Sequence, residues 1–288
     1  MTEAVARQNA EPDAELTLKD KVKKEIREWV SLLSVFIPAF LIFSGLLYEL
    51  RVIPSESMVP NLQVGDRVAV NKFAYGYSRH SMPFSLGRYM PLPDGRILGG
   101  TPKRGDVAVF EHTHTPRVMI KRIVGLPGDT VTVRDGQPIE INGTPIERTF
   151  VRRVRYRQHD SGAYVTAAEF TESYDGETWL THDIDGETGT NISITFQVPE
   201  KHYLFMGDNR DNSMDGRNVS GHCATNEAGI VDQAGCPPRP GWTPEQASIG
   251  FVPYQNLIGR ADTVLFSFYR CSRAQAEPCM KKRLWRGL

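Results

Sequence analysis

Hydrophobic residues form one long uninterrupted run, residues 29–48, which contains no charged side chain. A helix rises about 1.5 Å per residue, so a run of this length spans the hydrocarbon core of a bilayer, which is roughly 30 Å thick. Pro38 lies inside the run, and helices in a membrane tolerate proline better than helices in water do. The pattern predicts a transmembrane anchor over residues 29–50.

Basic residues gather before this anchor, whereas the residues just after it are of mixed charge. Because positive flanks remain on the cytoplasmic side, we expect a cytoplasmic tail at 1–28 and a plasma-membrane protein whose remaining residues lie outside, for example in the periplasm. A cleavable signal peptide is the alternative, but it would be shorter and would end in a small-x-small site, unlike Tyr48-Glu49-Leu50-Arg51. We therefore expect an uncleaved anchor in contact with lipid. The basic residues are Lys19, Lys21, Lys23, Lys24 and Arg27.

Beyond the anchor, hydrophobic and polar residues alternate in short runs, which is the pattern of β-strands with one solvated face. Residues 66–72 are the clearest case, and turns such as Gly125-Leu126-Pro127-Gly128-Asp129 separate such runs. The region 157–191 reads mainly as polar, acidic loops. No helical period is convincing outside the anchor, so we expect a mainly β domain. Further predicted strands are 106–110, 117–124, 130–133, 139–143, 151–156, 192–195, 203–206 and 256–268.

Two stretches depart from this alternation. Residues 73–100 are rich in aromatic and aliphatic side chains, and they are either an ordinary loop over the core or an apolar rim that contacts lipid. Residues 218–248 have a Gly-, Pro- and Ala-rich composition with no period, which indicates a loop.

Composition changes this picture in two respects. Lys+Arg and Asp+Glu both number 34 in 288 residues, so no net charge favours nucleic acid or an acidic partner. The four cysteines fall in two close pairs, which predicts the disulfides Cys223–Cys236 and Cys271–Cys279 in an oxidising compartment. A zinc site is the alternative, but neither pair has the short C-x2-4-C spacing that such sites prefer.

Candidate chemistry begins just after the anchor, in Ile53-Pro54-Ser55-Glu56-Ser57-Met58-Val59-Pro60. The prolines favour an extended backbone, on which the hydroxyls of Ser55 and Ser57 would point the same way. That arrangement suits a nucleophile with a neighbouring oxyanion donor, and it suits a serine-rich turn equally well.

A nucleophilic serine needs a base, and histidine is the first type of residue to test. His182 lies in the predicted acidic loops and His202 flanks a predicted strand, so we expect both at the surface rather than beside a serine. His112 and His114 could share one strand face and bind a metal ion, but no third ligand is apparent, so we expect no metal site.

Lys121 is the better candidate base. It lies in a predicted strand with Met119 and Ile123 on the same face. Apolar surroundings would desolvate the ammonium and lower its pKa, which leaves a neutral amine able to accept the proton of a serine. The alternative is a lysine that extends from a sheet edge to solvent.

Three motifs in this chain resemble, in their order, those of bacterial type I signal peptidases. They are Pro54-Ser55-Glu56-Ser57-Met58-Val59-Pro60, then Ile120-Lys121-Arg122-Ile123-Val124-Gly125-Leu126-Pro127-Gly128-Asp129, then Gly207-Asp208-Asn209-Arg210-Asp211-Asn212-Ser213-Met214-Asp215. The later segments 250–253 and 257–261 are also similar to the C-terminal part of that family. The resemblance implies a membrane-bound serine protease that removes signal peptides from exported proteins and uses no cofactor.

The resemblance also implies roles for single residues. Ser57 would be the nucleophile and Lys121 the general base, while Ser55 would donate to the oxyanion beside the Ser57 amide. Ser213 would hydrogen-bond to the lysine and orient it. The expected structural polar network is Asp208, Asp215 and Arg217, with the last two paired.

Signal peptides end in small-x-small sequences, so shallow apolar pockets would select the substrate. Ile53, Met58 and Ile120 are the candidate pocket residues. Signal peptides and the lipid bilayer are the expected partners, and the secretion translocon is a further candidate. The family fold implies an antiparallel β catalytic core, here 51–131 and 198–288, with an inserted β-ribbon cap at 132–197.

Two departures from the family pattern are visible. Gly216 stands where the family usually has serine, and the cysteine-containing insertion 218–248 replaces a short aromatic-Gly link. Two further hypotheses are a specialised peptidase of pilus or conjugation systems, or a self-cleaving relative, and an inactive membrane-anchored scaffold. The intact Ser57, Lys121 and Ser213 count against the scaffold.

Overall fold

The computed structural model describes residues 18–82, 87, 89, 95–134, 136–159, 161–186, 193–218, 230–231, 249–267 and 283–288. The four cysteines, and with them both expected disulfides, lie outside the described residues, as does most of the insertion 218–248. The chain divides into two compact units, one ending at Phe43 and the other extending from Ser44 to Leu288.

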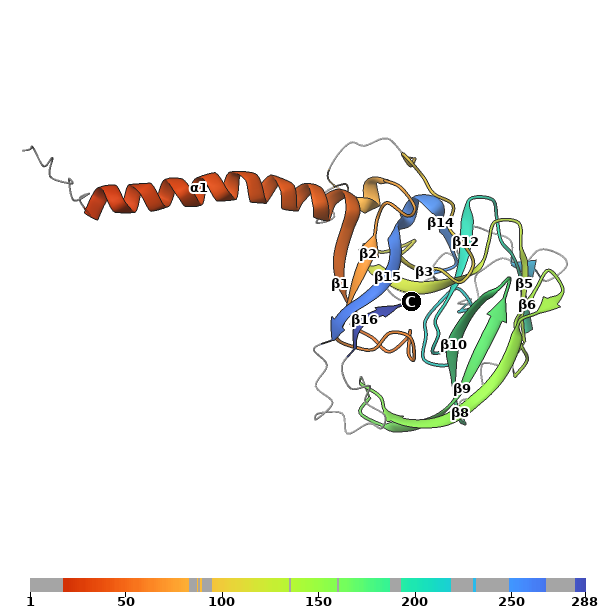
Figure 1. The fold of residues 1–288 in the computed structure, drawn as a ribbon. Helices are drawn as coiled ribbons and strands as arrows, with labels where there is room; N and C mark the ends of the chain where they lie inside the picture. Colours follow the sequence, from red (N-terminus) through yellow and green to blue (C-terminus); the bar gives the residue numbers. More distant parts are fainter. Residues whose placement is uncertain are drawn as a thin grey trace, which may run out of the picture. The chain divides into compact units, whose positions relative to one another are not determined.

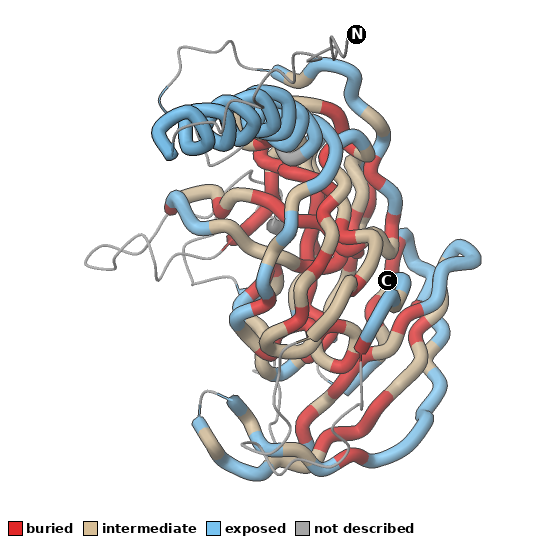
Figure 2. The backbone as a smooth tube through the Cα atoms, turned by 60° about the vertical axis from the view of Figure 1, so that its left-hand side comes forward, coloured by how far each residue is buried: buried red, intermediate tan, exposed pale blue. Residues whose placement is uncertain are grey.

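In its described part, the first unit consists of the helix α1 (Leu18–Ile42) and Phe43, where a π-helical turn begins that continues to Leu47. Every side chain of α1 is exposed, which Figure 2 shows as a pale blue helix. Residues 18–47 form a helix that is long and apolar enough, by length and composition, to cross a membrane. The helix begins before the expected anchor because the Lys- and Glu-rich residues that precede the apolar run are good helix formers. Residues 48–50 belong instead to a strand that pairs with β2 (Asp66–Asn71).

The second unit is mainly β, as the sequence predicts (Figure 1). Among the described residues, its largest sheet has eight strands, all paired antiparallel. In spatial order the strands are β1 (Tyr48–Val52), β2 (Asp66–Asn71), β15 (Leu257–Ser267), β3 (Val107–Glu111), β4 (Val118–Gly125), β12 (His202–Met206) and β14 (Phe251–Pro253), with β16 (Leu284–Gly287) beside β15.

Two smaller sheets complete the described part of the unit. We call the three-stranded sheet of β8 (Glu147–Arg157), β9 (Tyr164–Tyr174) and β10 (Glu177–Ile184) the cap sheet. The predicted cap region 132–197 supplies the whole cap sheet and much of the other one. The five-stranded sheet has the order β13 (Ile230–Val231), β11 (Ser193–Gln197), β5 (Thr130–Arg134), β6 (Glu140–Ile141) and β7 (Thr144–Pro145), and the cap sheet has the order β10 (Glu177–Ile184), β9 (Tyr164–Tyr174) and β8 (Glu147–Arg157). Two short 3-10 turns, at Arg79–Ser81 and Tyr254–Asn256, lie in the connections.

The expectation of polar loops over 157–191 is wrong, because this region contains β9 and β10. Glu169 and Glu172 of β9 are buried and form ion pairs with arginines of other segments. Buried acidic residues interrupt the alternation of apolar and polar residues by which a strand is recognised, so these strands resembled loops in the sequence.

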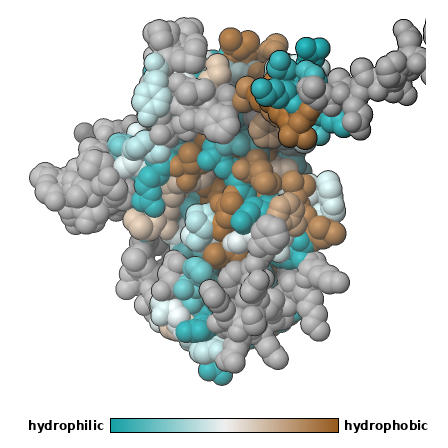
Figure 3. Space-filling view, turned by 90° about the vertical axis from the view of Figure 1, so that its left-hand side faces the viewer, coloured by the Kyte–Doolittle hydropathy of each residue, from teal (hydrophilic) through white to brown (hydrophobic). Residues whose placement is uncertain are grey.

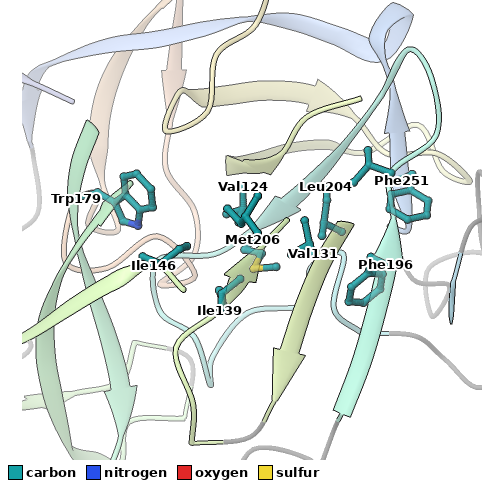
Figure 4. Close-up of a cluster of buried hydrophobic side chains, with 11 residues drawn as sticks. Val124, Val131, Ile139, Ile146, Trp179, Phe196, Leu204, Met206 and Phe251 are labelled. Carbon is teal, nitrogen blue, oxygen red and sulfur yellow. The ribbon is translucent and has the colours of Figure 1, made fainter. Parts of the chain in front are cut away.

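One hydrophobic cluster joins the three sheets (Figure 4). Val124 and Leu204 come from the large sheet, Val131 and Phe196 from the five-stranded sheet, and Trp179 from the cap sheet. Full burial of such a side chain contributes about 1.5–3 kcal/mol, so this cluster fixes the cap sheet on the core.

Large hydrophobic side chains are also exposed on the second unit, and Figure 3 shows such residues among hydrophilic ones on one face. Phe73, Ile97 and Leu98 in the region 73–100 are more than half exposed. Phe84, Leu86, Met90 and Leu92 lie outside the described residues. The alternative that this region contacts lipid remains a prediction.

Candidate active site

The segment 53–62 carries the two serines, and its first residue is fixed to the chain at 65–66. The Ile53 amide donates to Asp66 O at 3.0 Å, and Ile53 O accepts the Gly65 amide at 2.8 Å. The expectation of an extended backbone between the prolines is wrong beyond Glu56, because the Val59 amide donates to Glu56 O at 3.1 Å and closes a turn. The hydroxyls of Ser55 and Ser57 nevertheless lie 3.4 Å apart.

Two of the expected pocket residues, Ile53 and Met58, anchor this segment in the hydrophobic core. Ile53 and Met58 are buried in a cluster with core residues of β2, β3 and β15, and the half-buried Ile120 packs against the same cluster. Ile53 and Met58 therefore present almost no exposed surface to a substrate, and their role as pocket residues stays a prediction.

Lys121 of β4 and Ser57 of the segment 53–62 are in direct hydrogen-bond contact. Lys121 lies on β4, opposite Ala108 of β3, and its Nζ donates a hydrogen bond to Ser57 Oγ. Both side chains are buried, with exposed fractions of 4% and 8%. Burial lowers the pKa of Lys121 to about 8, although Asp215 and Asp208 act in the opposite direction. A neutral amine beside the serine is therefore accessible near neutral pH, and it can accept the proton of Ser57.

Ser213 lies close to this pair but does not make the expected hydrogen bond. Within the described residues, its buried Oγ has no hydrogen-bond partner. Gly207 separates Ser213 from Ser57: a Cβ added to Gly207 would lie 2.2 Å from Ser213 Oγ and 2.5 Å from Ser57 O. Any side chain larger than hydrogen at 207 would thus displace one of the two serines.

The polar network expected around the site is assembled by the loop 207–218. Asp215 receives two hydrogen bonds from the Arg217 side chain, at 2.8 and 2.9 Å, and one from the Gly207 amide at 2.8 Å. Burial alone would raise the pKa of Asp215, but Arg217 and these hydrogen bonds hold it below its usual value. The carboxylate therefore stays charged and fixes the loop beside Lys121.

Asp208 forms a second buried ion pair, and sequence reasoning did not identify its partners. Arg122 donates to both carboxylate oxygens at 2.7 Å, and Asn61 Nδ2 donates to Asp208 Oδ2 at 2.7 Å. Arg122 follows Lys121 on β4, so its side chain leaves the strand on the opposite face. The alternation of side chains between the two faces of a strand was the signal, available in the sequence, that Arg122 has a different role from Lys121.

The candidate histidines have hydrogen-bond partners other than Ser57, and the expectation that His182 lies at the surface is wrong. His182 is on β10 rather than in a loop and is buried, with Nε2 at 3.0 Å from Glu169 Oε2. His202 Nδ1 lies 2.8 Å from Glu200 O in a turn. His112 Nδ1 accepts the His114 amide at 3.0 Å, and among the described residues no group of three or more potential metal ligands exists.

One edge of β4 next to the site is open. Residues 118–122 pair with β3, whereas β12 pairs with β4 only from Arg122 onward. Among the described residues, the edge of 118–121 on the β12 side has no strand partner. A peptide that added a strand there would extend along β4 as far as Lys121, and thus past Ser57 Oγ.

Comparisons with known proteins find relatives of this chain. The family model described as signal peptidase, peptidase S26, matches residues 26–266. A signal peptidase I of Rickettsia bellii (strain OSU 85-389) is 32% identical over 258 residues, which cover 85% of this chain and 74% of that protein. A signal peptidase I of Rickettsia typhi is 30% identical over 255 residues, with coverage of 86% and 83%. A solved signal peptidase I from Enterococcus faecalis V583 matches 56% of this chain and 96% of that chain at 20% identity, with a TM-score of 0.27.

Proposed function

Because the chain belongs to the signal peptidase family, peptidase S26, we propose that this serine endopeptidase removes signal peptides from exported preproteins by means of a Ser57–Lys121 dyad. The observation that carries the proposal is the buried hydrogen bond between Lys121 Nζ and Ser57 Oγ. Relatives named signal peptidase I support the choice of substrate.

The reaction is an acyl transfer in two steps. Neutral Lys121 accepts the proton of Ser57, whose Oγ attacks the scissile carbonyl carbon and forms a tetrahedral oxyanion. The C–N bond then breaks, and Lys121 gives its proton to the leaving amine. A water molecule subsequently attacks the ester carbonyl and transfers a proton to Lys121. Lys121 then gives this proton to Ser57 Oγ as the ester C–O bond breaks, which releases the carboxylic acid product and restores the neutral amine.

Ser55 is positioned to stabilise the oxyanion. Its hydroxyl lies 3.4 Å from Ser57 Oγ, on the same segment as the Ser57 amide. Donors aimed at an oxyanion in a dry site contribute about 3 kcal/mol each to the transition state. Ser213 is proposed as a second hydrogen-bond partner of Lys121, because its buried Oγ has no partner among the described residues and lies across Gly207 from Ser57.

The open edge of β4 supports an extended substrate. Main-chain groups of 118–121 would pair with the signal peptide and direct its scissile bond to Ser57. The half-buried Ile120 packs against the cluster that contains the buried Ile53 and Met58, and we propose that it limits the adjacent substrate position to small side chains. This arrangement accounts for a small-x-small preference.

Membrane attachment fits the same substrate. The apolar helix and the family indicate a membrane-anchored protein. We propose that residues 1–28 face the cytoplasm and that the catalytic unit lies on the outer side of the plasma membrane, in contact with lipid and near the translocon. Few residues separate the helix from Ser57, so a signal peptide still held in the bilayer would present its cleavage site to the nucleophile.

The proposal is tested with the full-length protein in detergent and a synthetic peptide that contains Ala-x-Ala. We expect cleavage after the second alanine by the wild type, and none by Ser57→Ala or Lys121→Ala with an unchanged circular dichroism spectrum. His202→Ala, at a partly exposed turn, should cut at the wild-type rate. Retained cleavage by Lys121→Ala would exclude the dyad, and a wild type that cuts no such peptide would favour the inactive scaffold.

A further inference from the structure

Asn209 hydrogen-bonds to the two main-chain carbonyl groups that flank the Ser57 Cα, those of Glu56 and Ser57. Its amide donates to Ser57 O at 3.1 Å, and its Nδ2 donates to Glu56 O at 3.2 Å. Asn209 is completely buried, so these contacts are shielded from water. The position of the proposed nucleophile therefore depends on the position of Asn209.

The cap sheet holds Asn209 in turn. The His182 amide of β10 donates to Asp208 O at 2.9 Å, and His182 O accepts the Arg210 amide at 2.8 Å, so the loop continues the sheet at the β10 edge. The hydroxyl of Tyr156, on β8, accepts a hydrogen bond of 3.1 Å from Asn209 Nδ2. Asn209 Nδ2 thus links a cap-sheet side chain to the main chain beside Ser57.

Two further contacts strengthen this link. At the turn between β8 and β9, the His159 amide donates to Glu56 Oε1 at 2.8 Å. The ring of Tyr156 packs beside the ring of His182, with the centroids 5.9 Å apart, and His182 is held by Glu169. Burial raises the pKa of Tyr156 to about 12, so its hydroxyl remains neutral at any pH used for assay.

We propose that Tyr156 of the cap sheet is a positioning residue of the active site. Through Asn209, the Tyr156 hydroxyl fixes the main chain of Glu56 and Ser57 so that Ser57 Oγ stays aligned with Lys121 Nζ. This inference rests on the proposed function, because it concerns the reaction of Ser57. Small displacements of a nucleophile lower the rate of the chemical step more than they weaken substrate binding.

The test is Tyr156→Phe, which removes one oxygen atom and retains the ring beside His182. With the full-length protein in detergent and the Ala-x-Ala peptide, we expect kcat to fall about 5- to 10-fold and KM to change by less than about twofold, since a buried hydrogen bond of ordinary strength is lost from the alignment. The matched control is Tyr174→Phe in β9 of the same sheet, whose hydroxyl donates to Ile141 O at 3.2 Å away from the serines. The control should lower the unfolding midpoint similarly and leave kcat unchanged.

A double-mutant cycle shows whether Tyr156 acts through Asn209. Asn209→Ala removes both side-chain contacts, so adding Tyr156→Phe should lower kcat no further, whereas adding Tyr174→Phe should not couple to it. Wild-type kcat in Tyr156→Phe, an equal loss of kcat in Tyr174→Phe, or full additivity with Asn209→Ala would each overturn the inference while the proposed function stands. If the wild type cuts no peptide, the proposed function fails, and this inference fails with it.

Discussion

Burial of Lys121 separates its ammonium from water, and its pKa falls to about 8 as a result. An unfolded lysine titrates near pH 10.4, so below pH 8 the folded protein contains a buried charge that the unfolded chain would solvate. This cost reduces the free energy of unfolding by about 3 kcal/mol at pH 7. The cost decreases as pH rises from about 8 to about 10.4, because the folded protein loses its proton first.

Lys121→Met should therefore abolish cleavage and yet stabilise the protein. We expect the free energy of unfolding at pH 7 to rise by up to about 3 kcal/mol, and the difference from the wild type to shrink as pH increases above 8. Urea unfolding of both proteins between pH 6 and pH 10 measures this. A Lys121→Met protein that is less stable than the wild type at pH 7 would mean that the lysine stabilises the fold and is not desolvated.

The segment with both serines is held by elements far from it in the sequence. Arg283, just before the C-terminal strand β16, pairs with Asp66 at 3.1 Å and also donates to Asn61 O. Both side chains are almost completely buried. Burial raises the pKa of Asp66, and the Gln63 amide and Arg283 limit that rise. Residues from 53 to 66 are thus fixed by the loop 207–218, by the cap sheet and by the C-terminal end of the chain.

Arg283→Met should be strongly destabilising, because it leaves the Asp66 carboxylate buried without its cation. We expect a loss of about 3–5 kcal/mol in the free energy of unfolding at pH 7, measured in urea, and partial recovery in Arg283→Met with Asp66→Asn. Arg153→Met is the control: its partner Asp185 and Arg153 itself are largely exposed, so the loss should be under about 1 kcal/mol. Equal effects of the two arginine substitutions would show that the C-terminal pair does not hold the fold.

The β9 and β10 strands illustrate what the sequence could not reveal about single elements. Their buried Glu169, Glu172 and His182 resemble loop residues until their arginine and glutamate partners are placed in space. The strands β2, β3, β4, β12 and β15 of the large sheet are rich in apolar residues, and these were predicted, whereas β1, β14 and β16 were not. Element type was thus predictable where burial requires apolar side chains, and it was not where burial is achieved by ion pairs.

For the whole molecule, the apolar helix and the mainly β character follow from local patterns, and the sequence placed Lys121 and Ser57 in one site. The turn after Glu56, the open edge of β4 and the contacts of Asn209 with Tyr156 could not be predicted. Each depends on which distant strands become neighbours, and only the folded arrangement of three sheets decides that.

The central claim is that buried, neutral Lys121 activates Ser57, and the pH dependence of kcat/KM tests it most directly. The general base acts only when deprotonated, so with a pKa of about 8 its neutral fraction increases about tenfold between pH 7 and pH 9. With the Ala-x-Ala peptide and the full-length protein, we predict that kcat/KM rises about tenfold over this range, with an inflection near pH 8. A profile that is flat from pH 7 to pH 9, or that inflects near pH 6.5 as for an ordinary histidine, would contradict the account.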